Sequence, residues 1–295
     1  MVRANAPIAP RDREFHMREE DFRVIARTIY DHAGIVIGDH KKELVYSRLA
    51  RRLRQLGLSD FKGYLDRLDG PLGDAERNHL INALTTNHTN FFREAHHFDF
   101  IRERLVPYWK SRAKTTGVKR LRIWSAGCST GEEPYTLAMV LADTLGREGG
   151  WDWKILATDI DTNVLARCKA GEYEAAARSG IPEHYQKAFL RTIKNKTTHM
   201  RMAPELCRHL VFNRLNLHAS WPIRKPFDAI LCRNVTIYFD APAKNTLMRR
   251  FRELLKDDGC LFLGHSESLL GGVTDMSVAG RTIYVVNGGV HDARG

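Results

Sequence analysis

Apolar residues recur at helical spacing through the first third of the chain. Phe22, Ile25 and Ile29 lie three or four positions apart, and Gly34 follows as a stop signal. Similar stripes predict further helices at residues 41–56, 61–68 and 80–84. No alternating pattern typical of a strand lies among them. We therefore predict an all-helical domain over residues 17–88, preceded by a mobile tail, residues 1–16.

After residue 90 the pattern changes to short apolar runs that alternate with helical stretches. The expected strands cover residues 121–126, 154–158, 210–215, 229–232, 260–263 and 282–286. The expected helices cover residues 98–109, 132–145 and 162–170, with one more beginning at Pro242. Strands and helices that alternate at this length are typical of a parallel, doubly wound sheet. We predict that residues 89–295 form this α/β domain.

The alternation breaks between Gly171 and Arg208. A short helix at residues 183–189 precedes the polar stretch RTIKNKTTHMRM, residues 191–202. This pattern predicts a small antiparallel β-subdomain, inserted into the α/β domain at about residues 172–212.

The net charge of the chain indicates an anionic partner but does not identify its class. With 46 Lys and Arg against 35 Asp and Glu, the net charge is +11. That excess implies an anionic partner, which could be nucleic acid, an acidic membrane surface or an acidic protein. No apolar run reaches the roughly 18–20 residues that span a bilayer, so we expect no membrane insertion.

The cysteines and histidines show no framework for a disulfide or metal site. The five cysteines are far apart, and no CxxC pair occurs, which favours a reducing, cytoplasmic location. The 13 histidines lack HxxxH and HExxH spacing, so we expect no metal.

A glycine-containing loop follows the first predicted strand, in the sequence SAGCSTGEEP. Gly127 and Gly131 are spaced GxxxG, which matches neither the dinucleotide pattern GxGxxG nor a P-loop. Glu132 and Glu133 begin the next helix, where they would repel a pyrophosphate. S-adenosylmethionine has no phosphate but carries a sulfonium and an ammonium group, so an acidic loop suits it. Alternatively, the two glutamates only offset the helix dipole.

Further polar residues follow the second and fourth predicted strands. Asp159 ends the second strand, where a carboxylate can accept hydrogen bonds from both ribose hydroxyls; alternatively, it caps a helix. Asp161 is interpreted as the cap of the following helix. Arg233 and Asn234 directly follow a buried strand and are expected to face the cofactor. Tyr238 comes next, and it could instead pack in the core.

Five segments together resemble the chemotaxis receptor methyltransferase family, CheR. They are TNHTNFFREAHHF (86–98), WSAGCSTGEEPY (124–135), ATDIDTNVL (157–165), FDAILCRNVTIYF (227–239) and LFLGHSES (261–268). They occur in the family's order, and the N-terminal helices are also similar to that family. The resemblance implies a Rossmann-like class I methyltransferase. Such an enzyme would esterify glutamate side chains in the cytoplasmic helical domain of chemotaxis receptors and release S-adenosylhomocysteine.

The resemblance also implies residue roles. Arg93 and Tyr238 would be catalytic, with Arg93 holding the substrate carboxylate. The cofactor-binding residues would be Asn87, Thr89, Arg93, Gly127, Glu133, Asp159, Asn216, Leu217, Arg233 and Asn234.

Contacts with the receptor can also be predicted. Arg48, Arg51 and Arg52 form a basic stripe that could dock an acidic receptor helix; alternatively, they form an ordinary solvated face. Family members that tether a receptor-tail peptide carry a glycine in the inserted loop. Residues 192–199, TIKNKTTH, contain none, so we expect no peptide tether.

Two other classes of function compete with this interpretation. A nucleic acid methyltransferase would also explain the basic charge. However, the place of the usual [DN]PP[YF] motif holds Arg233-Asn234-Val235-Thr236, and the chain has no Pro-Cys pair. The other class is a non-catalytic protein that binds S-adenosylmethionine. The presence of Arg93, Glu133, Asp159 and Tyr238 favours an enzyme, and we expect no nucleic acid partner.

Overall fold

The computed structural model describes residues 13–269 and 273–287. The chain divides into two compact units, Met1–Thr85 and Thr86–Gly295. The first unit is helical and contains α1 (Glu19–Ala33), η1 (Asp39–Lys41), α2 (Lys42–Leu56), α3 (Phe61–Asp69) and α4 (Gly73–Leu84). The four helices predicted from the apolar stripes are therefore confirmed.

The core of the first unit is built from the predicted stripes. Ile25, Leu49, Leu53 and Phe61 are fully buried. Helix α1 ends where the sequence predicted, because Gly34 adopts a left-handed φ of 69° and donates to the Tyr30 carbonyl oxygen.

The predicted tail is only partly within the described residues, since residues 1–12 lie outside them. Phe15 is buried, and its amide donates to the Tyr46 hydroxyl at 3.2 Å. The prediction of a mobile tail is therefore wrong at Phe15, whose aromatic ring packs with the helical unit instead of remaining in water.

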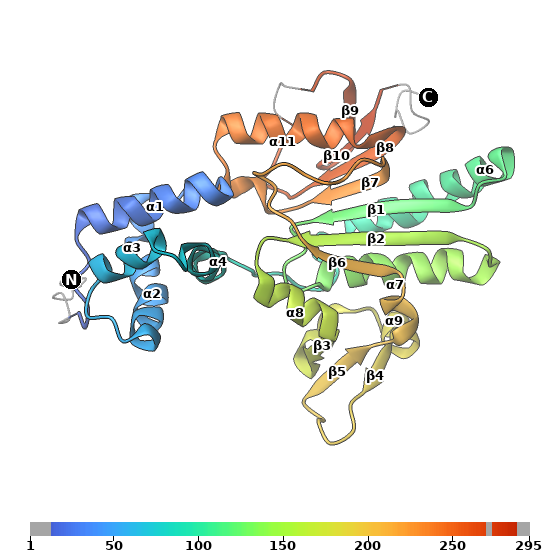
Figure 1. Ribbon diagram of the computed structural model, residues 1–295. Coiled ribbons are helices and arrows are strands. Elements are labelled where there is room, and N and C mark those ends of the chain that lie inside the picture. Colours follow the sequence, from blue (N-terminus) through green and yellow to red (C-terminus); the bar gives the residue numbers. More distant parts are fainter. Residues whose placement is uncertain (1–12, 270–272, 288–295) are drawn as a thin grey trace, which may run out of the picture. The chain divides into compact units, whose positions relative to one another are not determined.

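The second unit contains a seven-stranded sheet in the order β6-β2-β1-β7-β8-β10-β9. Its strands are β1 (Arg120–Ala126), β2 (Asp152–Asp159), β6 (Leu210–Arg214), β7 (Phe227–Cys232), β8 (Leu255–Leu263), β9 (Met276–Gly280) and β10 (Ile283–Val286). Its helices outside the insertion are α5 (His96–Phe100), the π-helix η2 (Ile101–Leu105), α6 (Val106–Thr116), α7 (Glu132–Leu145), η3 (Gly146–Glu148), α8 (Thr162–Ala170), η5 (Thr236–Tyr238) and α11 (Ala241–Glu253). The predicted doubly wound α/β fold is confirmed (Figure 1).

Helices cover both faces of this sheet, and the side chains of the strands alternate between two cores. In β1, Leu121 and Ile123 pack with α6 and α7. Trp124 and Ala126 pack on the opposite face, against α11. Both faces of β1 are therefore buried from Ile123 onward, as is typical of a strand in a parallel sheet.

The last two strands differ from the parallel arrangement that the sequence predicted. Strand β10 pairs antiparallel with β8 and with β9. Strand β9 was not predicted at all; it is short and lies at the sheet edge. A turn at Arg281 and Thr282, where Thr282 has a φ of 56°, replaces the long crossover that a parallel partner would need.

The insertion is a three-stranded antiparallel sheet in the order β3-β5-β4. Its elements are β3 (Glu172–Glu174), η4 (Ala175–Gly180), α9 (Glu183–Phe189), β4 (Leu190–Thr192), β5 (His199–Met202) and α10 (Pro204–Cys207). The predicted antiparallel insertion is confirmed. However, residues 210–212, which we placed inside it, belong to β6 of the main sheet.

Candidate active site

Three loops meet at the carboxyl ends of β1, β2 and β7. Ala126 lies opposite Thr158 in the β1–β2 register, and Ser125 lies opposite Leu231 in the β1–β7 register. The residues that follow these strands therefore leave the sheet at one edge. The strand order also reverses between β1 and β7, which is where doubly wound sheets bind ligands.

The loop after β1 runs close to its neighbours. Gly127 has a φ of 82°, and its amide donates to the Thr158 carbonyl oxygen at 2.8 Å. A Cβ atom at this position would lie 2.4 Å from Val235 Cγ2. Only glycine fits here, as expected for a backbone that a ligand must approach closely.

Asp159 is a buried carboxylate at the end of β2. Its Oδ2 accepts from the Ser129 amide at 2.8 Å, and its Oδ1 accepts from the Asp161 amide at 3.0 Å. Burial raises its pKa from 3.8 to about 6. The Ile160 amide also acts on this carboxylate and opposes the rise in pKa. A carboxylate offers about four lone pairs, so these amides still leave capacity for a ribose hydroxyl.

Asp161 has the separate role that the sequence predicted. Its side chain caps α8 by accepting from the Asn163 amide at 2.8 Å. The other oxygen accepts from Asn87 Nδ2 at 2.8 Å, and the Asn87 carbonyl accepts from Ser129 Oγ at 3.0 Å. Asn87 is thus fixed beside the loops after β1 and β2. Thr89 is half-buried in the same segment.

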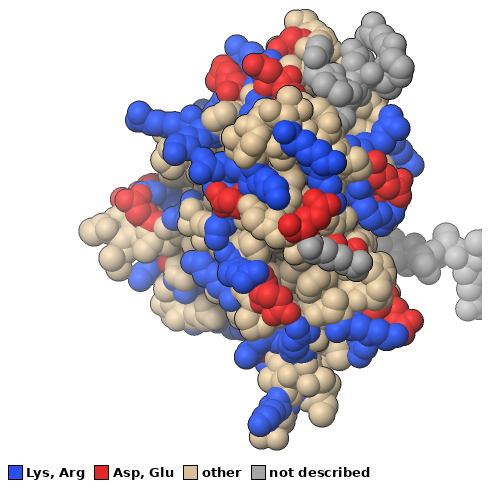
Figure 2. Space-filling model, turned by 90° about the vertical axis from the view of Figure 1, so that its right-hand side faces the viewer, with Lys and Arg blue, Asp and Glu red and all other residues tan. Residues whose placement is uncertain are grey.

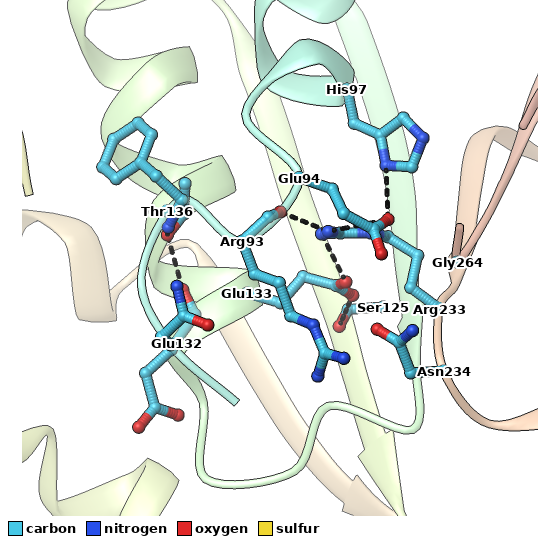
Figure 3. Close-up of polar contacts among 12 residues, drawn as sticks. Arg93, Glu94, His97, Ser125, Glu132, Glu133, Thr136, Arg233, Asn234 and Gly264 are labelled. Carbon is cyan, nitrogen blue, oxygen red and sulfur yellow. Dashed lines mark hydrogen bonds and ion pairs between the residues drawn. The ribbon is translucent and has the colours of Figure 1, made fainter. Parts of the chain in front are cut away.

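A buried ion-pair cluster joins residues that are far apart in sequence (Figure 3). Arg233 Nη1 donates to Glu133 Oε2 at 3.1 Å, and its Nη2 lies 3.2 Å from Glu94 Oε2. Nη2 also donates to the Arg93 carbonyl oxygen. The other oxygen of Glu133 accepts from Ser125 Oγ at 2.7 Å. Arg233 therefore holds two acids from different segments in place.

The pKa values of the two acids in this cluster are shifted in opposite directions. For Glu133, burial raises the pKa despite the nearby Arg233 charge. For Glu94, burial also acts upward, but the Arg233 charge and hydrogen bonds from His265 lower the pKa to about 2. Burial and the same guanidinium lower the pKa of His97 to about 3, so its imidazole is neutral at pH 7.

The predicted catalytic residues are partly exposed. Arg93 Nη1 donates to the His88 carbonyl oxygen at 2.9 Å, and among described residues Arg93 forms no ion pair with an acid. In Figure 3 its side chain extends away from Arg233. Tyr238 lies in η5 and is half-buried, whereas its neighbour Phe239 packs against the core.

The loop after β6 contains two of the residues predicted to bind the cofactor. Asn216 Oδ1 accepts from the His218 amide at 2.9 Å. Leu217 is buried, and its carbonyl oxygen accepts from Arg250 Nη1 at 3.0 Å. The Arg250 guanidinium also stacks on Trp221 at 3.6 Å from the ring centroid, which ties this loop to α11.

Strained backbone concentrates in these loops. Phe92 and Glu94, on either side of Arg93, have φ of 53° and 56°, and Ser129 and Asn234 have φ of 50° and 59°. Residues other than glycine rarely adopt such backbone angles, which cost about 1–3 kcal/mol each. Surrounding contacts must therefore hold these residues in place, as expected of a preorganised site.

The three arginines predicted to dock the receptor are in different surroundings within the first unit. Arg48 donates to the Ala83 and Thr85 carbonyl oxygens. Arg52 pairs with the buried Glu76 at 2.7 Å. Arg51 is exposed. The stripe thus combines two arginines that bond within the unit with one that faces solvent.

Sequence reasoning missed two acids of this region, Glu94 and Glu267. Both lie inside the quoted motifs, TNHTNFFREAHHF and LFLGHSES. An acid within a motif is a signal that could have drawn attention to them. Their partners, however, are distant in sequence and could not be inferred from spacing.

The arrangement fits a cofactor with positive charge and a ribose diol. Asp159 has free lone pairs for hydroxyls, and Glu133 presents a buried carboxylate on the first turn of α7. The two glutamates on that first turn, Glu132 and Glu133, would repel a phosphate group that a bare helix start attracts. A doubly wound fold with this acidic edge is typical of class I S-adenosylmethionine-dependent methyltransferases.

Comparison with known protein families supports this assignment. Residues 87–285 match the "CheR methyltransferase, SAM binding domain" and residues 20–85 match the "CheR methyltransferase, all-alpha domain". The chain belongs to the CheR methyltransferase family, and S-adenosylmethionine is its cofactor.

Curated relatives cover nearly the whole chain. The chemotaxis protein methyltransferase of Salmonella typhimurium is 44% identical over 92% of this chain and 91% of its own. That of Escherichia coli is 44% identical over 92% of each chain. Among solved structures, the glycopeptide N-methyltransferase MtfA matches 53% of this chain and 55% of its own, at 17% identity and a TM-score of 0.30.

No helix in the described part of the chain is long and apolar enough to span a membrane.

Proposed function

We propose that this protein transfers the methyl group of S-adenosylmethionine to glutamate side-chain carboxylates of chemotaxis receptors. Two relatives named chemotaxis protein methyltransferases, matched over 92% of this chain, support a role in chemotaxis. The observation that carries the substrate class is Arg93. Its guanidinium forms no ion pair with an acid among the described residues, although Glu94 is the next residue in the chain, so it is available for an incoming carboxylate.

The chemistry needs positioning more than proton transfer. Bound S-adenosylmethionine supplies an electrophilic methyl group on a sulfonium. A glutamate side chain, with a pKa of about 4.3, is already ionised at pH 7, so no general base is required. The protein must align the attacking oxygen and remove water from it.

Arg93 and Tyr238 are proposed to do this alignment. The planar guanidinium of Arg93 can hold a carboxylate by two parallel hydrogen bonds. The Tyr238 hydroxyl lies in the loop after β7 and is proposed to orient the carboxylate or the methyl group. Neither residue has to gain or lose a proton.

The other predicted residues are proposed to hold the cofactor. Asp159 would accept from the ribose hydroxyls and Glu133 from the ammonium group. Gly127 and Asn234 would line the loops on either side. Asn87, Thr89, Arg93, Asn216, Leu217 and Arg233 complete the proposed set.

Transfer of labelled methyl groups tests the proposal directly. The purified protein is incubated with labelled S-adenosylmethionine and receptor-containing membranes, and the products are treated with base. Base-labile label indicates a carboxyl ester and supports the proposal. Base-stable label indicates N- or C-methylation and contradicts it, and no label favours a non-catalytic binding protein. A parallel reaction with nucleic acid tests the competing enzyme class.

Receptor contacts are proposed to use exposed charge. Figure 2 shows Lys and Arg spread over one face, with Asp and Glu between them, so the net charge does not mark a single binding site on that face. Arg51, with Arg48 and Arg52 beside it in sequence, is proposed to meet the acidic helical domain of a cytoplasmic receptor region. Binding of a receptor-tail peptide to the β3-β5-β4 insertion is not expected, and a titration would test this.

A further inference from the structure

Glu267 is a buried acid that the proposed mechanism does not use. It follows β8 in the motif LFLGHSES, and only 6% of its surface is exposed. Its own amide donates to the Gly264 carbonyl oxygen at 2.9 Å, which closes a tight turn at the end of the strand. The carboxylate is thereby directed back toward the loop that follows β7.

Five donors surround this carboxylate. Oε2 accepts from the Gly264 amide at 2.6 Å and from the Asn234 amide at 2.8 Å. Oε1 accepts from the Val235 amide at 2.9 Å, the Thr236 amide at 2.7 Å and the Thr236 hydroxyl at 2.8 Å. Glu267 forms no ion pair within the described part of the chain. Three consecutive amides of one loop thus depend on a single side chain.

The anchored loop is also the strained one. Asn234 has a φ of 59°, and its amide is fixed by Glu267 in that conformation. A Cβ atom at Gly264 would lie 2.5 Å from Asn234 Nδ2, so the turn after β8 packs directly on the asparagine. Val235 in turn contacts Gly127, as described above. The position of one loop therefore constrains the loop after β1.

The same anchor reaches Tyr238 through the backbone. The Tyr238 amide donates to the Val235 carbonyl oxygen at 3.2 Å, so the η5 turn starts from a residue that Glu267 holds. A shift of residues 234–236 would move both Asn234 and the tyrosine.

We infer that Glu267 is a positioning residue for methyl transfer, because its carboxylate fixes the backbone of Asn234, Val235 and Thr236 and so orients Asn234 and Tyr238. The inference rests on the function proposed above for Tyr238. All the hydrogen bonds described for the Glu267 carboxylate go to the turn after β8 and to residues 234–236, so it acts through the loop.

The first test compares Glu267→Gln with Glu103→Gln. The glutamine keeps the shape but turns an NH2 group toward amide donors, so at least two hydrogen bonds are lost. Glu103 is an exposed acid that pairs with its neighbour Arg102 at 2.8 Å on the surface, and its variant should match wild type. We expect kcat of Glu267→Gln to fall on the order of 10²-fold, the effect of about 1 Å of misplacement. An unchanged kcat would overturn the inference.

A double-mutant cycle separates positioning from general damage. If Glu267 acts through the tyrosine, Glu267→Gln should cost less than about threefold in kcat when Tyr238→Phe is already present. An equal loss in both backgrounds would show a merely structural role. Thr236→Val removes only the hydroxyl donor and serves as the mild variant if Glu267→Gln does not fold. It should lower kcat several-fold with the same dependence on Tyr238.

A measurement of cofactor affinity tests the inference without depending on the methyl acceptor. Titration calorimetry with S-adenosylhomocysteine should show about tenfold weaker binding to Glu267→Gln than to wild type. In an Asn234→Ala background the difference should disappear, and a difference that persists would contradict the inference. If wild type forms no base-labile ester, the proposed function fails, while this titration still decides whether Glu267 positions Asn234.

Discussion

Removing Arg233 should destabilise the protein and abolish cofactor binding together. In Arg233→Met, the apolar stem is kept and the guanidinium is lost. Only 2% of the Arg233 side chain is exposed, against 11% for Glu94 and 12% for Glu133. The change leaves two buried carboxylates without their shared cation, and breaking a buried pair in this way costs about 3–5 kcal/mol.

The pH dependence of the loss has a definite sign. The pKa of Glu94 is held at about 2, below its ordinary 4.5, because the Arg233 charge and the hydrogen bonds from His265 outweigh burial. The stability from this ionised group is present above about pH 4.5 and is lost as the pH falls toward about 2. The difference between wild type and Arg233→Met should therefore shrink over that range.

Denaturant unfolding of both proteins, followed by circular dichroism, measures the cost. Arg112→Met is a matched control, because Arg112 joins the buried Asp228 and the half-buried Asp258, each at 2.5 Å, outside the site. It should also unfold more easily but bind S-adenosylhomocysteine normally once folded. Adding Glu133→Gln to Arg233→Met should recover about 1–3 kcal/mol, the cost of one unpaired buried group. An Arg233→Met protein within about 1 kcal/mol of wild type would refute the reasoning.

Four further predictions concern single residues elsewhere in the structure. Because burial raises the pKa of Asp159 to about 6, S-adenosylhomocysteine should bind more tightly as the pH rises through that value. Calorimetry of Asp159→Asn should show weak binding with little pH dependence. Arg52→Ala should lower the free energy of unfolding by about 1–3 kcal/mol, since it leaves the buried Glu76 without its closest cation. Arg51→Ala should leave thermal stability unchanged but weaken receptor binding, most clearly at low salt. Gly127→Ala should cost about 1–3 kcal/mol in chemical unfolding, because φ is 82° and the new methyl group would collide with a neighbouring side chain.

The local pattern of apolar residues was sufficient to predict much of the fold. Helices α7, α8 and α9 begin and end at the residues that apolar spacing predicted. The Asp161 cap was also correctly placed. Such features depend on residues within a few positions of one another, so their determinants are contiguous in the sequence. Strand β9 was missed because a short edge strand lacks the buried alternation that identifies a strand.

The contacts that organise the site depend on tertiary structure. Arg233 meets Glu133 across 100 positions and Glu94 across 139 positions. Glu267 meets Asn234 across 33 positions. No spacing rule connects residues so far apart. They meet because the parallel register of β1, β2 and β7 and the adjacent β8 bring several strand ends to one edge.

The sequence by itself determined the class of fold, the acidic glycine-containing loop and the family motifs. The tertiary structure decided which charged residues are already paired and which are available. Among the described residues, Arg93 and Arg51 form no ion pair, whereas Arg233 and Arg52 pair with buried acids. The physical reason is that burial and pairing depend on what packs around a side chain, and in this fold those neighbours come from distant segments.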